Sequence, residues 1–439
     1  MMIQQHKRFG NDLVFLCVGM LFPFIIRLLF PDIYHHFDVG AFNEWIPYTH
    51  PFSDVYQTSC YCNYPIVGML LSSGVMDMLG GSIIAFLLFL SFFESLNVLL
   101  FYVLLKKLNA PYSGCLAFIF IILPSTWSGG ALWGQIDHIG LTWIFLLIVL
   151  IHTIYEKLQQ PESKVSPFVY LAIGLLSYLT LFTKQLMVFP LLPVMVALLL
   201  ILFSVKGYKN KMIAFLMMAG GAIIPFFAVE AWLNTDAQYT FGHYQRILAT
   251  GSDHMDIISG NGVNLWTLFY QQLEHPSTQP FLAGITPKHL GVFLFFVTGV
   301  WLTIQYIRKN TAASATFKTG WLCLFIAAFN LGFNVLLTGT HERYLFYFYP
   351  FLLIAYVTLN KKYIRFSLTD KWFFFASSVL YGMFVLSILN KWLKVNDQHV
   401  NSGFHKVIAV VHIVLLFRLI WIYATFPRPE KQESGNNHE

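Results

Sequence analysis

Long apolar runs alternate with short polar segments along almost the whole chain. Runs of roughly 17–25 apolar residues predict membrane-spanning helices, because an unpaired backbone is too costly in hydrocarbon. Residues 64–80 are apolar but short and interrupted by glycine, so we predict a re-entrant or interfacial segment there. The pattern predicts an all-α polytopic membrane protein with about twelve transmembrane helices, at residues 12–30, 83–105, 114–130, 139–155, 167–182, 186–205, 212–233, 289–307, 319–337, 344–359, 372–390 and 406–425.

Composition and charge support this class of protein. Of the 439 residues, 57% are hydrophobic and 11% are charged, whereas soluble domains have about 25% charged residues. The net charge of +6 is small, and orientation in a bilayer explains it better than binding to nucleic acid. With the N-terminus inside, 18 of the 27 Lys and Arg residues fall in inner segments, which predicts that both termini are cytoplasmic.

The loops on the two predicted faces differ in length. Residues 31–82 and 234–288 form two long outer loops, which we expect to carry short interfacial helices, whereas most inner loops are short. Loops longer than about 15 residues usually carry function, so the outer face is the predicted working face. We predict one transmembrane domain over residues 1–439, with a disordered cytoplasmic tail at 426–439.

Five polar motifs fall on this outer face. The first, YHHFDVGAFNEW, follows the first span and contains Asp38 and Glu44. A carboxylate at the membrane surface is a candidate general base, because partial desolvation raises its pKa. The alternatives are a solvated loop acid or a helix cap. A metal site is less favoured, because the adjacent histidines point in different directions.

The second and third motifs combine aromatic and polar residues. Tyr64 and Pro65 open the short apolar segment and fix an extended entry into it, which is more often structural than catalytic. The stretch SGGALWGQIDHIG places Trp133, Gln135 and Asp137 at the outer end of a helix. Trp alone is typical of the interfacial aromatic belt, but hydrogen-bonding groups beside an aromatic face suit a sugar ring.

The last two motifs bring positive charge to a face where it is otherwise scarce. Lys184, in LFTKQLMVFPLLP, is either a snorkelling lysine or an ammonium that holds a lipid phosphate. In THERYLFYFYP, Arg343 can bind a phosphate bidentately, Glu342 can orient it and His341 can donate a hydrogen bond. The alternative is a structural Glu–Arg pair at a helix start. Glu94, in the middle of a span, is predicted to pair with a neighbouring helix.

Together and in this order, the motifs resemble those of the GT-C superfamily of integral-membrane glycosyltransferases, and most closely bacterial relatives of the GPI-anchor mannosyltransferases. The chain departs from that pattern at Ile66, where a second proline is common, and at Tyr347, which replaces a proline. The resemblance covers most of the chain and is carried by Asp38, Tyr64–Pro65, Trp133–Asp137, Lys184–Gln185 and His341–Phe346.

The resemblance implies a GT-C fold in the bacterial cytoplasmic (inner) membrane. It implies a polyprenyl-phosphate-linked hexose donor, with mannose favoured, and inverting transfer to a hydroxyl of a lipid- or protein-linked acceptor on the outer face. In this hypothesis Asp38 is the base, and the donor phosphate is bound by Lys184, Arg343 and His341. Sugar and acceptor contacts come from Trp133, Gln135, Asp137, Glu342, Glu44 and Tyr64. Two cations can stabilise the leaving phosphate, so we expect no cofactor and no divalent metal.

Two other classes of protein stay open. A transporter or flippase of a lipid-linked sugar also suits twelve spans. It should place its polar groups near the midplane, on broken helices of matching halves, whereas this sequence gathers them at one face and shows no repeat. A membrane acyl- or phosphotransferase is the second alternative. Convergence of Asp38, Asp137, Lys184 and Arg343 on a groove open to lipid would favour the glycosyltransferase, and a central two-sided cavity would favour transport.

Overall fold

The computed structural model describes residues 2–56, 62, 64–160, 163–233, 256–310, 314–359, 367–393 and 403–425, which are mostly helical. The longer helices are α1 (Met2–Leu29), α5 (Ile83–Lys107), α6 (Ser113–Ile122), α8 (Asp137–Gln159), α9 (Pro167–Thr183), α10 (Val188–Ser204), α11 (Tyr208–Trp232), α13 (Pro287–Lys309), α14 (Ala315–Leu336), α15 (Phe348–Leu359), α16 (Leu368–Leu393) and α17 (Gly403–Thr425). Shorter α-helices are α2 (His36–Glu44), α3 (Ile66–Met69), α4 (Val75–Met78) and α7 (Pro124–Trp127).

Single turns and two strands complete these elements. The 3-10 turns are η1 (Ile46–Thr49), η2 (Phe52–Asp54), η5 (Gln185–Met187), η6 (Leu265–Leu268) and η7 (Tyr344–Tyr347). The π turns are η3 (Leu70–Gly74) and η4 (Ser128–Leu132). The strands β1 (Ser259–Gly260) and β2 (Thr340–His341) have two residues each.

All twelve ranges predicted to be spans fall mainly on helix. Within the described ranges, nine helices are long and apolar enough to cross a membrane. A tenth crossing is formed if α6 and α7–η4, which bend by 55° at their break, count as one span. Helices α9 and α15 are apolar but shorter, with 17 and 12 residues. The helices therefore indicate an integral membrane protein, whereas the count of twelve spans stays a prediction.

Local sequence signals explain where several helices begin and end. Ser82 Oγ accepts a hydrogen bond from the backbone of Ala85 and caps α5, and two lysines in the last turn complement the helix dipole. At α13, Thr286 caps the helix and Pro287 occupies the first helical position, where its missing N–H costs nothing. The polar residues that interrupt the apolar runs therefore also fix the helix ends.

The helices differ in how far the protein encloses them. Helix α14 is central: 94% of its most apolar stretch is buried, and it packs against α8, α10, α13, α15 and α17. Helix α11 is the opposite case, with 11% of its stretch buried and with Phe215, Leu216, Ile224 and Phe227 exposed. Apolar side chains exposed along a whole helix of this length indicate contact with lipid.

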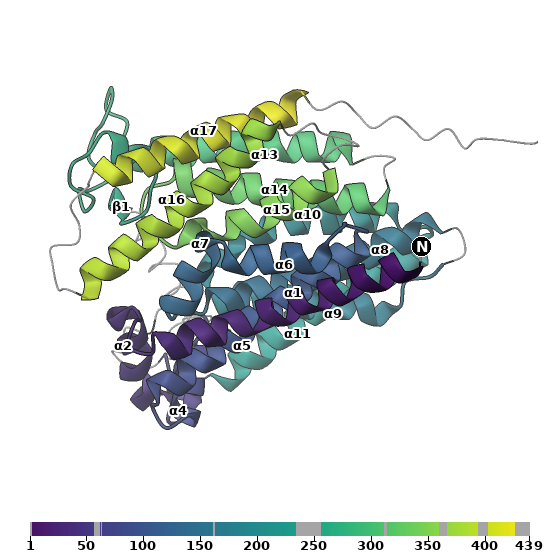
Figure 1. Ribbon diagram of the computed structural model, residues 1–439, viewed down its shortest axis with the longest axis horizontal. Coiled ribbons are helices and arrows are strands. Elements are labelled where there is room, and N and C mark those ends of the chain that lie inside the picture. Colours follow the sequence, from purple (N-terminus) through teal and green to yellow (C-terminus); the bar gives the residue numbers. More distant parts are fainter. Residues whose placement is uncertain are drawn as a thin grey trace, which may run out of the picture.

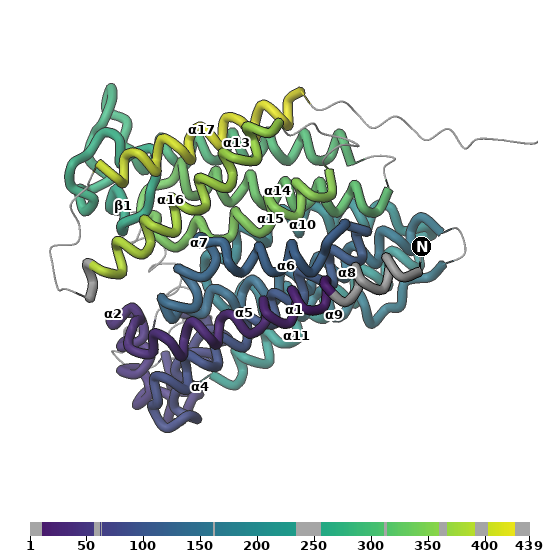
Figure 2. Tube along the Cα trace, in the orientation of Figure 1, coloured from purple at the N-terminus to yellow at the C-terminus, as the bar shows by residue number. Residues whose placement is uncertain are grey.

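Figure 2 shows α1, α5, α9 and α11 on one side of the bundle and α13, α16 and α17 on the other, with α14 and α15 between them. The N-terminus lies at one end of the bundle, and α2, α4 and β1 lie at the other (Figure 1). The segments predicted to be outer thus gather at the end away from the N-terminus. Which side of a membrane each end faces stays a prediction.

The predicted first outer loop is folded onto this end of the bundle. Helix α2 packs against η3 and α4, and α3 packs against α9. Residues Ile66–Met78 form one short apolar helix with a π turn inside it. A Cβ atom on Gly68 would overlap the backbone carbonyl of Thr183, so this helix closely approaches the end of α9. That close approach brings Tyr64 to the end of α9.

The predicted second outer loop is described from residue 256 onward, and residues 234–255 and the tail at 426–439 lie outside the described residues. Strand β1 pairs in parallel with β2, with Ser259 beside Thr340 and Gly260 beside His341. Ser259 Oγ also donates to the Thr340 carbonyl at 3.0 Å. This outer segment is therefore attached to the chain directly before Glu342.

Candidate functional site

Five segments that are far apart in the sequence meet at the end of the bundle that carries α2 and β1. They are the first turn of α2, the chain before α3, the stretch from η4 into α8, the link between α9 and η5, and the turn between β2 and η7. A continuous set of hydrogen bonds and ion pairs joins eight of the predicted site residues, Asp38, Tyr64, Trp133, Gln135, Asp137, Lys184, Glu342 and Arg343.

Asp38 lies in the first turn of α2, where the helix dipole favours a carboxylate. Three groups approach one of its oxygens, Oδ2. Trp133 Nε1 donates to it at 2.7 Å, His35 Nδ1 lies 3.0 Å away and Arg343 NH1 lies 3.4 Å away. None of these contacts uses Oδ1. The Gln135 side chain is a further neighbour that lowers the pKa of the Asp38 carboxyl.

The charge of Asp38 follows from these neighbours. Burial by itself raises the pKa of the Asp38 carboxyl, but the Arg343 guanidinium and the His35 ring outweigh it and hold the pKa well below its usual range. Asp38 is therefore ionised at physiological pH. It is also a weak base in this arrangement, because Arg343 stabilises its negative charge.

His35 positions Asp38 and was missed as a site residue in the sequence. Its ring stacks on Trp133 with centroids 4.5 Å apart and an interplanar angle of 14°. Its backbone N–H donates to the Trp133 carbonyl at 3.0 Å, and its Nδ1 accepts the backbone N–H of Asp38 at 3.2 Å. The same Nδ1 also lies 3.0 Å from Asp38 Oδ2, and it can cap α2 only without a proton and donate to the carboxylate only with one.

The second half of the cluster is a buried ion pair. Lys184 Nζ donates to both carboxylate oxygens of Asp137, at 2.9 and 2.8 Å, and the two side chains are 3% and 4% exposed. Tyr347 donates to Asp137 Oδ1 at 2.7 Å. Gln135 Oε1 lies 3.5 Å from Nζ and accepts the Tyr64 hydroxyl at 2.8 Å. Three acceptor contacts match the three N–H groups of the ammonium.

The surroundings of Lys184 exclude the snorkelling alternative. Nζ lies 5.7 Å from the centroid of the Tyr64 ring and 6.0 Å from that of Tyr344, so the side chain points into the protein. Burial lowers the pKa of Lys184, and the carboxylate of Asp137 opposes that effect only in part. Direct binding of a phosphate by Lys184 stays a prediction, because its donors already have partners.

Arg343 is the less enclosed of the two cations, with 11% of its side chain exposed. Its NH1 lies 3.0 Å from Glu342 Oε1 and 3.4 Å from Asp38, and its Nε lies 4.0 Å from Asp137. The guanidinium also lies over the Trp133 ring, 5.9 Å from the centroid. Burial raises the pKa of Glu342, and Arg343 offsets only part of this shift. One guanidinium is thus shared among three carboxyl groups.

Two predicted site residues lie at the margin. His341 packs against the outer segment: a Cβ atom on Gly260 would overlap its imidazole, and its ring lies 5.0 Å from that of Tyr344. Glu44 is exposed at the end of α2. The predicted phosphate contact of His341 and the predicted acceptor contact of Glu44 stay predictions.

Tyr347 is a second residue that sequence reasoning missed. It stands where the resembling family has a proline, and its hydroxyl binds both the side chain and the backbone carbonyl of Asp137, at 2.7 and 3.2 Å. The run holds three tyrosine hydroxyls, at Tyr344, Tyr347 and Tyr349, and nothing in the sequence singles out Tyr347. The departure from the family pattern therefore supplies a hydrogen bond to the buried ion pair.

A second buried polar group adjoins the cluster. Glu94 of α5 is 1% exposed, and its Oε1 lies 3.9 Å from Nε2 of His138 on α8. Asn97 donates to the His138 carbonyl at 2.8 Å. Gly130 fits beside the acid and the imidazole, and a Cβ atom there would overlap both. Glu94 therefore faces a neighbouring helix, but its 3.9 Å contact with His138 is longer than a hydrogen bond, and the predicted pairing stays a prediction.

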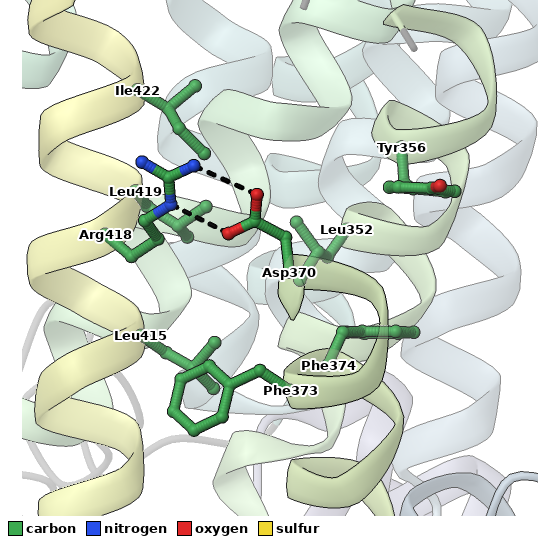
Figure 3. Close-up of a pocket in the computed structure, with 9 residues that line it drawn as sticks. All are labelled: Leu352, Tyr356, Asp370, Phe373, Phe374, Leu415, Arg418, Leu419 and Ile422. Atoms are coloured by element: carbon green, nitrogen blue, oxygen red, sulfur yellow. Dashed lines mark hydrogen bonds and ion pairs between the residues drawn. The ribbon is translucent and has the colours of Figure 1, made fainter. Parts of the chain in front are cut away.

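A pocket between α15, α16 and α17 lies away from this cluster (Figure 3). Apolar side chains line most of it. Arg418 donates to both oxygens of Asp370 at 2.8 and 2.9 Å across it. Asp370 is eleven positions along α16 from Tyr381, which binds the Glu342 carbonyl, so about 16 Å of helix separates the two.

Among the described residues, no group of three or more His, Cys, Asp or Glu side chains is arranged to hold a metal ion. No protein-family profile matches the chain, and no curated protein shows significant sequence similarity to it. The chemistry of the cluster itself is therefore the basis for assigning a function. It offers an anchored carboxylate, an arginine shared among acids and an aromatic face, all at one end of an apolar bundle.

Proposed function

We propose that this protein is a membrane glycosyltransferase that moves a hexose from a polyprenyl-phosphate-linked donor to an acceptor hydroxyl. Mannose is the favoured sugar, and the acceptor is a lipid- or protein-linked glycan. The bacterial cytoplasmic membrane, with both termini in the cytoplasm and the reaction on the outer face, is part of this proposal. The observation that carries it is the position of Arg343 beside Asp38, at the end of helices that face lipid.

Each group has a chemical task in this reaction. Asp38 accepts the proton of the acceptor hydroxyl as its oxygen attacks C1 of the sugar. The bond between C1 and the phosphate oxygen breaks, and its electron pair stays on the departing polyprenyl phosphate. Arg343 stabilises the charge that develops there. The Trp133 ring and the Gln135 amide offer a stacking face and hydrogen bonds for the sugar.

The transporter alternative fits the cluster less well. A transporter binds its cargo near the bilayer midplane, on interrupted helices of matching halves. Asp38, Lys184 and Arg343 come instead from a loop helix and from two links at helix ends. A lipid phosphate lies at the membrane surface, so groups at helix ends are suited to meet it.

Purified protein incubated with a panel of radiolabelled polyprenyl-phosphate sugars and membrane extract tests the proposal. Wild type should transfer one sugar, with mannose tried first. Asp38→Asn should reduce the rate at least 100-fold, because a positioned base contributes about 10²- to 10⁴-fold. Asp32→Asn, which removes an exposed acid from the same loop, is the matched control. Near-normal turnover by Asp38→Asn would remove the base assignment, and no transfer of any sugar would remove the function.

A further inference from the structure

Arg343 is engaged by two acidic side chains in the structure. Its NH1 is 3.0 Å from Glu342 and 3.4 Å from Asp38, and this pairing depresses the basicity of Asp38. A base that keeps this partner throughout the reaction would be poorly suited to accept a proton. The proposed function therefore requires that something weakens the Asp38–Arg343 pair before proton transfer.

The two cations of the site differ in how a ligand can reach them. Lys184 is 3% exposed, and its three N–H groups point to Asp137 and Gln135. Arg343 is more exposed, and its contact to Asp38 is longer than a strong charged hydrogen bond. A guanidinium binds a phosphate through two parallel N–H groups. An incoming phosphate therefore competes best for Arg343.

We infer that the donor phosphate displaces Asp38 from Arg343, so that binding of the donor itself turns Asp38 into an effective base. This inference rests on the proposed function. Trp133 keeps Oδ2 in place through its 2.7 Å hydrogen bond while the arginine changes partner. Before the donor arrives, Asp38 is held as a weak base, which suppresses proton transfer in its absence.

The displacement also fits the movement of charge in the reaction. The acceptor proton goes to the Asp38 carboxylate, whose Oδ2 is held by Trp133. The C1–O bond electrons go to the phosphate, which leaves as a monoester with one more negative charge than the bound diester. Arg343 is then paired with the group whose charge increases, and no longer with the group whose charge is lost.

Because coupling between sites is reciprocal, the competition is measurable as binding. The probe is farnesyl phosphate in detergent micelles, with farnesol as the uncharged control. If Asp38 competes for Arg343, Asp38→Asn should bind farnesyl phosphate at least about fivefold more tightly than wild type, as expected for an ion pair of about 1 kcal/mol. Affinity for farnesol should not change. Glu342→Gln, which removes another carboxylate that contacts Arg343, should also tighten binding, and Asp32→Asn should not.

The outcomes separate the inference from the function. Tighter binding by Asp38→Asn and by Glu342→Gln, with Asp32→Asn unchanged, supports the competition. If wild type prefers farnesyl phosphate to farnesol but both variants bind it no more tightly, the competition is absent while the proposed function stands. If wild type binds both probes equally, the site does not recognise a lipid phosphate, and the function and the inference fail together.

Discussion

The buried pair between Lys184 and Asp137 gives the sharpest test of how this site is held together. Replacing Lys184 by Met removes the ammonium and leaves a carboxylate that is 4% exposed. Replacing Asp137 by Asn removes the carboxylate and leaves the ammonium. The double variant removes both charges, so the three variants form a thermodynamic cycle that isolates the interaction between the two side chains.

The distances set the size of the expected effects. At 2.8 Å and an effective dielectric constant of about 20, the attraction is about 6 kcal/mol, and the cost of desolvating both ions cancels most of it. Losing one partner of a buried pair costs about 3–5 kcal/mol. Lys184→Met should lie in this range. Asp137→Asn should cost less, because burial already lowers the pKa of Lys184 and allows it to lose its proton.

Equilibrium unfolding in mixed micelles, followed by tryptophan fluorescence as sodium dodecyl sulfate is added, measures these free energies. The double variant should be more stable than the sum of the two single effects predicts, by at least about 2 kcal/mol. The exposed pair Lys107–Glu156, 3.8 Å apart with side chains 35% and 44% exposed, provides a control cycle with a coupling below about 1 kcal/mol. If the Lys184 and Asp137 effects add to within about 0.5 kcal/mol, the reasoning is refuted.

Three further predictions use other parts of the site. Trp133→Phe keeps the aromatic ring but loses the donor to Asp38, so we expect about tenfold slower transfer in the radiolabel assay, from the loss of roughly 1.4 kcal/mol. Burial raises the pKa of Glu342, and its protonated form does not compete for the neighbouring arginine. The ratio of the farnesyl phosphate affinity of wild type to that of Glu342→Gln should therefore fall as pH rises through the pKa of Glu342. Gly130→Ala should lower stability by more than about 2 kcal/mol because its Cβ overlaps buried side chains, whereas a Cβ on Gly129 meets nothing within 4 Å.

Each of these predictions has an outcome that contradicts it. An unchanged transfer rate in Trp133→Phe would mean that the 2.7 Å hydrogen bond does not position Asp38. A pH-independent affinity ratio would mean that Glu342 does not compete with the phosphate, since titration of the ligand cancels in the ratio. Equal stability of the Gly130→Ala and Gly129→Ala variants in the detergent titration would mean that the tight packing around Gly130 relaxes at no cost.

The sequence located the helices because a bilayer imposes long apolar segments whatever the fold. It also located most of the cluster, because polar residues at the ends of such segments are few. It did not predict the pairing. Lys184 has an extended backbone between α9 and η5, with φ −158° and ψ 139°, which turns its side chain inward to Asp137. That orientation depends on how α8 and α9 pack, and no local signal encodes it.

The exact contacts of Asp38 were beyond sequence reasoning for a similar reason. Trp133 directly follows the π turn η4, its indole reaches Asp38 in the first turn of α2, and His35 stacks on the same indole. The tandem histidines suggested a metal site at most. Packing places His35 beside Asp38 and Tyr347 beside Asp137, and the sequence alone does not show these contacts.

The order of the charges along the chain has a consequence for biosynthesis. Asp38 and Asp137 are made first, and the cations that neutralise them follow, with Arg343 arriving only after three quarters of the chain. An incomplete nascent chain therefore carries unpaired acids at one end of its helices. All charges of the cluster are present only once the segment that follows α14 has been made, so the cluster is completed late, before only α15, α16 and α17.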